Sequence, residues 1–507
     1  MSTMVAPAYG RAVSPRLRSK RARNARETAG LQTWRMSRTP ILPLLLSTSL
    51  ALTGCASYSG IHGEAQALAP ESLAFHPQDT SGAWPREDWW STFGDPKLDA
   101  LMRQALEGSP SLRAAEARVR AAAALADAAR SSLYPTLDLN ASATRQRFSA
   151  NDIYPPPLGG SWVNQGRATL DFNYEFDFWG KHRNELKAAL GDARAAQADA
   201  AQARLVLSSA LAQTYFQTQT DLATLAVARQ TLAQRESLGE LNRVRTSRGL
   251  ESSIVVRQSD QQIAASRVDV SAAQAGVELD RHQLAALVGL GPDATLDMEP
   301  TLHPYGERLA LPANLPADLL ARRPDVAAQR WRLEAAAASI GAAKADFFPN
   351  INLVAFAGFG ATSFHSLDLF SHGSGLAGVG PALHLPIFDA GRLRAGLRGR
   401  YGDYDAAVEQ YNQTLLDALR QVADQVTSVR AVREQLGEQA NAVAAAEDAY
   451  RLTLDRYRAG LTSYLDVIVN EERLLTERQN HVRVQGRSLA VAVDTMRALG
   501  GGYHAEN

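Results

Sequence analysis

The chain has a single cysteine, no excess of either charge and no long apolar run beyond its N-terminal region. One cysteine excludes a disulfide framework and a thiolate metal cage. The basic and the acidic residues number 53 each, which argues against nucleic acid as a partner. No apolar stretch after Cys55 approaches the roughly 18 residues of a membrane-spanning helix. If the mature protein spans a membrane, it must therefore do so with a barrel of strands.

Motifs of enzyme chemistry are also missing. His303, His365, His372 and His384 lie in or beside predicted loops and strands, without the H-E-x-x-H spacing of a zinc hydrolase. The chain has no G-x-S-x-G elbow and no G-x-x-x-x-G-K phosphate loop. We therefore expect no catalytic residues, no metal and no cofactor beyond a covalent lipid, and a protein that does not itself energise transport.

The N-terminal region carries the sequence LTGC at residues 52–55, directly behind the apolar run 41–52. A small-residue pair that ends in Cys behind a short apolar core is typical of a bacterial lipoprotein signal. The run is too short to span a bilayer. The pattern predicts cleavage before Cys55 and a lipid on that residue. Ala56 follows where an Asp tends to retain lipoproteins at the inner membrane, so Ala56 favours the outer membrane.

Residues 1–35 are rich in arginine and have no apolar periodicity, whereas Met36 opens an ordinary signal peptide. The sequence is compatible with translation that starts at Met1 or at Met36. Residues 1–54, a basic extension and a lipoprotein signal peptide, are excluded from the fold. The mature chain then starts with an N-terminal segment, residues 55–97. The alternative is an accidental LTGC in a soluble chain.

The mature chain repeats itself. A shift of 214 residues places Pro110 on Pro324, Pro135 on Pro349 and the alanine block 121–124 on 335–338, with about eleven identities in about thirty positions. A shift of 211 residues aligns later glycines, among them Gly180 with Gly391 and Gly249 with Gly460. We expect two copies of one unit, at residues 98–288 and 317–499. A connector rich in Pro and Gly, residues 289–316, separates them, and residues 500–507 form a tail.

Each copy changes from helical to strand periodicity and back. Residues 98–132 and 317–346 predict helices, and Pro135 ends the first. Strands are predicted at 136–141 and 169–178, then at 351–359 and 379–388, with a loop inside each pair. Leu170, Phe172, Tyr174, Phe176 and Phe178 should lie on one face of the second strand. Four strands are too few to close a barrel around a pore, so we expect oligomerisation.

Very long helices should follow the strands. Residues 181–246 and 392–458 contain no proline, and each would form a helix of roughly 100 Å. The second helix carries a coiled-coil heptad, with Val408, Leu415, Val422, Val429, Leu436, Val443, Tyr450 and Tyr457 in register. Returning helices at 252–287 and 462–498 are about half as long. We predict turns at Gly249 and Gly460, and a meeting of the connector and both chain ends at mid-height.

These motifs resemble the outer-membrane factor family of tripartite export systems, the TolC-like channels, and in particular its NodT-type lipoproteins. The resemblance covers nearly all of the mature chain. The resemblance rests on six motifs: WWSTFGDPKLDAL at 89–101, SPSL at 109–112, RRPDV at 322–326, DFFPNI at 346–351, LPIFDAGR at 385–392 and YRAGLTSYLDV at 457–467.

The resemblance implies a mixed α/β membrane protein that forms a homotrimer. Long helices would form a coiled-coil barrel across the periplasm, and four strands per chain would form a trimeric twelve-stranded outer-membrane β-barrel. The protein would be a passive, lipid-anchored exit duct in the outer membrane. A periplasmic adaptor protein would grip its tip, and an inner-membrane pump would supply the energy.

The resemblance also assigns roles to residues near the turns. Gly249, Leu250, Gly460 and Leu461 match the tips that contact the adaptor. Asp466 matches an aspartate that narrows the aperture, where three copies would form a ring that favours cations.

Tyr457 matches a tyrosine of the closed-state latch, although it also continues the heptad and fits an ordinary core position. The chain departs from the family at Val469 and Val255, where further acids can occur. At most one acidic ring is therefore expected.

The sequence leaves the cargo open. Drugs, metals, oligosaccharides and proteins all fit an exit duct, and efflux of small molecules is the reading we favour. An outer-membrane channel for type I protein secretion is one alternative. A periplasmic coiled-coil lipoprotein without a pore is another, although a spacer has no use for strands with an aromatic face.

Overall fold

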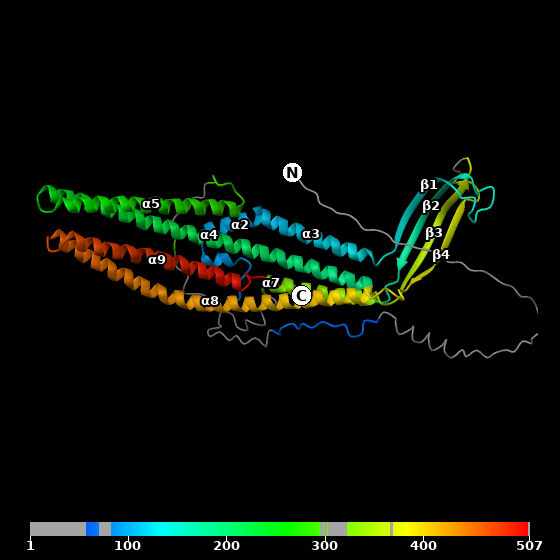
Figure 1. Ribbon diagram of the computed structural model, residues 1–507. Coiled ribbons are helices and arrows are strands. Elements are labelled where there is room, and N and C mark those ends of the chain that lie inside the picture. Colours follow the sequence, from blue (N-terminus) through cyan, green and yellow to red (C-terminus); the bar gives the residue numbers. More distant parts are fainter. Residues whose placement is uncertain are drawn as a thin grey trace, which may run out of the picture. The chain divides into compact units, whose positions relative to one another are not determined.

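The computed structural model describes residues 57–69, 83–294, 298, 302, 322–365 and 369–504. The predictions for residues 1–54, Cys55, most of the connector and residues 505–507 lie outside these described residues. The chain divides into two units, Met1–Cys55 and Ala56–Asn507. All of the described helices and strands belong to the second unit (Figure 1).

The second unit contains two similar series of elements. The first series is η2 (Trp89–Phe93), α2 (Pro96–Gly108), α3 (Pro110–Ser131), β1 (Thr136–Arg147), β2 (Trp162–Glu175), α4 (Lys181–Ser247) and α5 (Ser253–Val288). The second series is α7 (Pro324–Ala345), β3 (Asn350–Ser363), β4 (Gly375–His384), α8 (Arg392–Arg458) and α9 (Tyr464–Ala498).

The two copies predicted from the sequence are confirmed by the lengths of these elements. Helices α3 and α7 have 22 residues each, and helices α4 and α8 have 67 residues each. The shift of 214 residues relates both ends of the first pair, and the shift of 211 residues relates both ends of the second pair. Helices α3 and α5 both pack along α4, while α7 and α9 both pack along α8, as the predicted topology requires.

The prediction of one helix over residues 98–132 is wrong. The structure breaks this segment into α2 and α3 at Ser109, whose backbone is extended with φ −68° and ψ 124°. Pro110 explains the break, because the residue before a proline is disfavoured in the helical region and proline has no N–H to donate.

The four strands form one antiparallel sheet in the order β1-β2-β3-β4. Strands β2 and β3 join the two copies at the centre, so β1 and β4 lie at the edges. The predicted strands were misplaced at their ends. Phe176 and Phe178 lie beyond β2, and Phe388 lies beyond β4. The chain leaves the sheet there because Asp177 and Asp389 accept backbone N–H groups at the starts of α4 and α8.

The heptad predicted for the second long helix is confirmed. All of its eight positions are buried or half-buried in the structure, including Val408, Leu415 and Tyr457, each with an exposed fraction of 0 %. Helix α4 is more enclosed still, because it packs against α3, α5, α7 and α9. Gly191 of α4 permits one of these contacts, since a Cβ atom there would lie 3.0 Å from the Cβ of Ala335 on α7.

The described parts of both chain ends and of the connector meet as predicted. Met298 lies in the cluster around Trp89, and Tyr503 packs against a small cluster at the start of α7. The guanidinium of Arg322 lies 4.9 Å from the ring centre of Trp84. The glycines after α9 let the C-terminal end pass across the chain at Arg322, just before α7, and we call this place the mid-height crossing. A Cβ atom on Gly500, whose φ is 87°, would collide with the carbonyl oxygen of Arg322.

Replacing Gly500 with alanine tests this close approach. We expect Gly500→Ala to lower the free energy of unfolding by about 1–3 kcal/mol, because the residue is held at positive φ and has no room for a methyl group. Gly437→Ala is the matched control, since Gly437 is an exposed residue inside α8 with no atom near its missing Cβ. The control should stabilise by up to about 1 kcal/mol. Denaturant unfolding followed by circular dichroism measures both, and equal effects would refute the argument.

Candidate functional site

Two tight turns at the ends of the long helices form the candidate site, and each depends on a glycine. Gly249, between α4 and α5, has φ 76°, and Gly460, between α8 and α9, has the same φ. Other residues rarely adopt this conformation, which explains the glycine at each of the two predicted turns. We call the two turns with their flanking residues, 248–252 and 459–463, the tips.

Each tip presents one leucine to the solvent. The backbone N–H of Leu250 donates to the carbonyl of Arg245, and that of Leu461 donates to the carbonyl of Arg456, both at 2.9 Å. These bonds satisfy the last helical carbonyls and fix the turn. The side chains remain outside, with exposed fractions of 64 % for Leu250 and 68 % for Leu461. The predicted contact residues are therefore accessible, and their contact with an adaptor stays a prediction.

Asp466 lies in the first turn of α9, where it caps its own helix. Its Oδ2 atom accepts hydrogen bonds from Thr462 Oγ1 at 2.6 Å and from Ser463 Oγ at 2.7 Å. The backbone N–H of Ser463 also donates to Oδ2 at 3.1 Å, and the N–H of Asp466 donates to Ser463 Oγ at 3.4 Å. This reciprocal arrangement is a capping box. The hydrogen bonds from Thr462 and Ser463 lower the pKa of Asp466, so the exposed carboxylate is ionised at neutral pH. Its position at an aperture stays a prediction.

Tyr457 is fully buried where the two helical hairpins meet. Its hydroxyl donates to Asn242 Oδ1 at 2.8 Å, and Asn242 Nδ2 donates to Ser259 Oγ at 2.6 Å. Ser259 Oγ in turn lies 2.9 Å from the hydroxyl of Tyr464. This first polar layer connects α4 and α5 to α8 and α9. Burial raises the pKa of Tyr457, so its hydroxyl keeps its proton and can donate.

A second polar layer lies further from the tips. Arg235 Nε donates to Glu471 Oε2 at 3.1 Å, and Arg235 Nη1 donates to Ser266 Oγ at 3.0 Å. Both charged side chains are only 6 % exposed, which makes this the most buried ion pair among the described residues. Burial raises the pKa of Glu471, which Arg235 opposes. Apolar residues also pack in this region, because Leu238 on α4 and Ile468 on α9 belong to the same apolar cluster as Tyr457.

Sequence reasoning missed Arg235, Asn242 and Glu471. Ala228, Arg235 and Asn242 follow one another at seven-residue spacing, and all three are buried. The predicted heptad covers only the second long helix. Tracing it along the first would have placed a charged residue and an amide in the packed seam, where buried polar groups need partners.

The RRPDV motif has a structural role. Arg323 is 5 % exposed and donates to the carboxylate of Asp325, to the side chain of Gln421 and to the carbonyl oxygen of Ala498. One guanidinium thereby ties the start of α7 to α8 and to the end of α9. The motif holds the mid-height crossing together and lies far along the chain from the tips.

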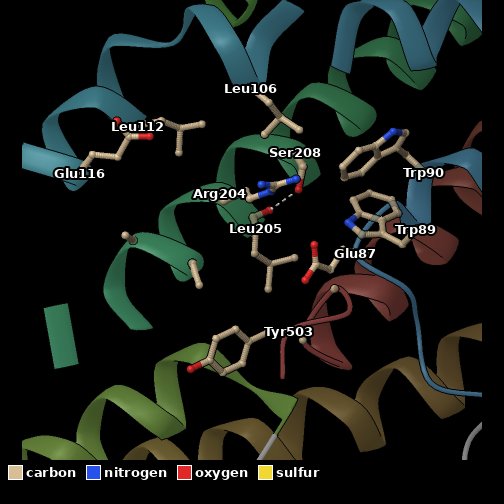
Figure 2. A pocket seen from close by; sticks show the side chains of 14 residues that line it. Glu87, Trp89, Trp90, Leu106, Leu112, Glu116, Arg204, Leu205, Ser208 and Tyr503 are labelled. Carbon is tan, nitrogen blue, oxygen red and sulfur yellow. Dashed lines mark hydrogen bonds between the residues drawn. The ribbon is translucent and has the colours of Figure 1, made fainter. Parts of the chain in front are cut away.

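A cavity of about 350 Å³ lies beside this crossing (Figure 2). Trp89, Trp90 and Leu106 line it, and Tyr503 lies across the cavity from Leu106. The exposed fractions of the two tryptophans are 1 % and 7 %, so their rings belong to the core. Ser208 at its wall donates to the carbonyl oxygen of Leu205 at 3.1 Å.

Among the described residues, no helix combines the length and the apolar character needed to cross a bilayer. Within the same part of the chain, no group of three or more His, Cys, Asp or Glu side chains could hold a metal ion.

A family model described as "Outer membrane efflux protein" matches residues 101–290 and 315–501. The chain belongs to the outer membrane efflux protein family. The two matched stretches correspond to the two structural copies. The family is one of efflux channels, which places this chain in the outer membrane as the channel of an efflux system. The expectation that it catalyses no reaction stays a prediction.

Curated relatives and a solved structure agree with this assignment. The chain is 31 % identical over 480 residues to the multidrug resistance outer membrane protein MdtP of Escherichia coli K12, covering 93 % of this chain and 98 % of the relative. It is 38 % identical to the fusaric acid resistance protein FusA of Burkholderia cepacia, covering 70 % of this chain and 68 % of the relative.

The outer membrane protein VceC of Vibrio cholerae is similar in structure. Its TM-score is 0.75 at 37 % identity, with 83 % of this chain and 100 % of VceC covered. This likeness and the two copies of strands and long helices confirm the predicted fold class.

Substitutions at the second polar layer test its energetics. We expect Arg235→Met and Glu471→Leu each to lower the free energy of unfolding by about 3–5 kcal/mol, because each leaves one buried charge without its partner. The double variant should lie within about 2 kcal/mol of the unchanged protein, since apolar side chains of similar volume replace the pair.

The exposed pair of Arg267 and Glu236, at 2.8 Å, supplies the control. Arg267→Met should cost less than about 1 kcal/mol. Denaturant unfolding of the detergent-solubilised protein measures all four variants. A double variant as unstable as the single ones would contradict the buried-pair argument.

Proposed function

We propose that three copies of the chain assemble edge to edge into a passive exit duct for small organic molecules. The observation that carries the proposal is the open sheet at the end of the long helices. Its edge strands β1 and β4 have unused backbone groups, which favour pairing with another copy. Leu137, Leu139 and Val379 on these edges are 66 %, 70 % and 76 % exposed. Three sheets of four strands would close as a ring of twelve.

The helices supply the periplasmic part of the duct. At 67 residues, α4 and α8 are each roughly 100 Å long, which suits a passage across a wide aqueous compartment. The chain would provide only the passage, and an inner-membrane pump would supply the energy. The relatives' names, multidrug resistance and fusaric acid resistance, support small organic molecules as cargo.

The tips are the proposed contacts with a periplasmic adaptor protein. The side chains of Leu250 and Leu461 are exposed, while their backbone N–H groups donate to carbonyls of the preceding helices. Exposed leucines at the ends of two rigid hairpins suit an apolar contact with a partner helix. A lipid on Cys55 is the proposed anchor of the chain in the outer membrane.

Polar substitutions at the tips test the adaptor contact. We expect Leu250→Ser combined with Leu461→Ser to weaken adaptor binding by about tenfold or more, because two exposed apolar anchors are lost. Leu452→Ser is the control, since Leu452 is 61 % exposed on α8 outside the tips. Site-specific crosslinking to the adaptor and drug accumulation in cells report the effect. Equal crosslinking in the tip variant and the control would exclude the tips as the docking site.

Charge removal tests the proposed aperture. If three Asp466 carboxylates line the duct, Asp466→Asn should reduce the preference for cations and weaken block by trivalent cations in planar bilayers. Asparagine keeps the size and an oxygen acceptor for the capping box, so α9 should remain capped. Asp448→Asn, at an exposed acid on α8, is the control. Unchanged selectivity and block in Asp466→Asn would leave Asp466 as a helix cap alone.

A further inference from the structure

A histidine lies between two carboxylates where the sheet leads into the first long helix. His182 Nε2 lies 3.1 Å from Glu175 Oε2, and His182 Nδ1 lies 2.9 Å from Glu185 Oε2. Glu175 is the last residue of β2, whereas His182 and Glu185 belong to α4. One imidazole ring therefore connects the sheet to the helix, and we call these three residues the joint.

The geometry of the joint requires a proton on each nitrogen of the ring. A carboxylate only accepts hydrogen bonds, whereas a neutral imidazole has one N–H donor and one acceptor nitrogen. In the neutral form, one nitrogen would therefore point its lone pair at a carboxylate oxygen. The imidazolium form donates to both carboxylates. The side chain of His182 is only 12 % exposed, so water has little access to replace either partner.

Three features of the surroundings oppose a positive charge on His182. The residue lies in the first turn of α4, where the helix dipole disfavours a cation. Lys181 is a second cation that interacts with both carboxylates of the joint, although its ammonium bonds to Asp346 at 2.9 Å. Burial of the ring also disfavours the charged form. The hydrogen bonds to Glu185 and Glu175 outweigh this burial and raise the pKa of His182 above its ordinary value of 6.5.

Neighbouring charged side chains have partners elsewhere. Arg183 of α4 pairs with Asp177 at 3.1 Å. On the elements packed against α4, Arg130 of α3 pairs with Asp127 at 3.0 Å, and Lys344 of α7 lies over an aromatic ring of α8. The β3 residue opposite the end of β2 is an uncharged asparagine. The imidazole is therefore the group of the joint that changes charge near neutral pH.

The second copy of the chain provides an internal comparison. The shift of 211 residues places Leu393 at the position of His182. The same shift places Gly396 at the position of Glu185. Leu393 is 8 % exposed and belongs to an apolar cluster at the start of α8. The second long helix therefore begins with an apolar contact where the first has a titratable ring.

We propose that His182 is a proton-dependent fastener between the sheet and the first long helix. When protonated, the ring binds the end of β2 to the first turns of α4. When the ring loses its proton, one carboxylate is left facing a lone pair and the end of β2 is released from the helix. The apolar contact at Leu393 keeps the junction of β4 with α8 unchanged in both states. The device lies within one chain and does not depend on the proposed assembly or cargo.

The direction of the pH effect follows from the raised pKa of His182. The joint contributes its full stabilisation below about pH 6.5, where the ring is charged in the folded and the unfolded chain alike. This contribution is lost as the pH rises through the raised pKa of the folded chain. Acidification therefore stiffens one of the two junctions between helices and sheet.

Hydrogen exchange followed by mass spectrometry tests the joint in the detergent-solubilised protein. Peptides from the junction of β2 with α4 are measured at about pH 6 and about pH 8, with correction for intrinsic exchange rates. We expect their protection to fall about threefold or more at the higher pH, because a buried charge-assisted contact is lost. Peptides from the junction of β4 with α8 are the internal reference and should keep their protection.

Three variants identify the titrating group. His182→Gln should abolish the transition, because glutamine keeps a donor and an acceptor but does not titrate. Glu185→Gln should move the midpoint of the transition to lower pH, because one of the two carboxylates that raise the pKa of His182 is removed. His282→Gln, at an exposed histidine of α5, is the matched control and should leave the transition unchanged.

The result in the unchanged protein decides the matter even without a variant. Equal protection of the β2–α4 peptides at both pH values would overturn the proposal, and so would a parallel loss in the β4–α8 peptides. A transition that persists in His182→Gln with native circular dichroism would exclude His182 as the titrating group. An unmoved midpoint in Glu185→Gln would likewise contradict the joint.

Discussion

Close packing of small residues along α4 is the constraint on which the rest of the structure depends. This helix contacts α3, α5, α7 and α9, so both copies of the chain are built around it. About half of its buried residues are Ala, Gly, Ser or Thr, which allow helix axes to approach closely. At Gly486 of α9, a Cβ atom would collide with Thr220 of α4. The alanine-rich composition that makes the sequence look featureless is therefore what lets long helices pack over their full length.

The two polar layers near the tips follow from this packing. A seam of small residues does not favour one axial register of two helices over another. Helices joined by such a seam alone could shift by one heptad along their axes. Arg235 and Asn242 each have a specific partner on another helix, which fixes one register. The layers also connect the first hairpin to the second within one chain. A movement of the tips therefore has to carry both hairpins together or break buried polar contacts.

Sequence periodicity predicted most of this architecture, because helix and strand periods survive wherever one face is buried. The heptad through Val408 and Leu415 and the two strands in each copy followed from it, while the paired turn glycines followed from the internal repeat. The break at Ser109 was missed although Pro110 signals it, and the strand ends were misplaced at Phe178 because an aromatic alternation continues past the cap at Asp177. The pairing of Arg235 with Glu471 could not be derived, since it depends on which distant helix faces which.

The order of the strands carries a consequence for the history of the fold. The pairing of β2 with β3 joins the first copy to the second, and an edge-to-edge pairing of β4 with β1 of a neighbour would join the second to the first. Six half-length chains could therefore have built the same ring with sixfold symmetry. Fusion of two such chains would leave each half free to specialise. Ala446 stands where repetition would place a second Arg235, and Val255 stands opposite Asp466. A ring of three present-day chains would retain sixfold geometry but only threefold chemistry.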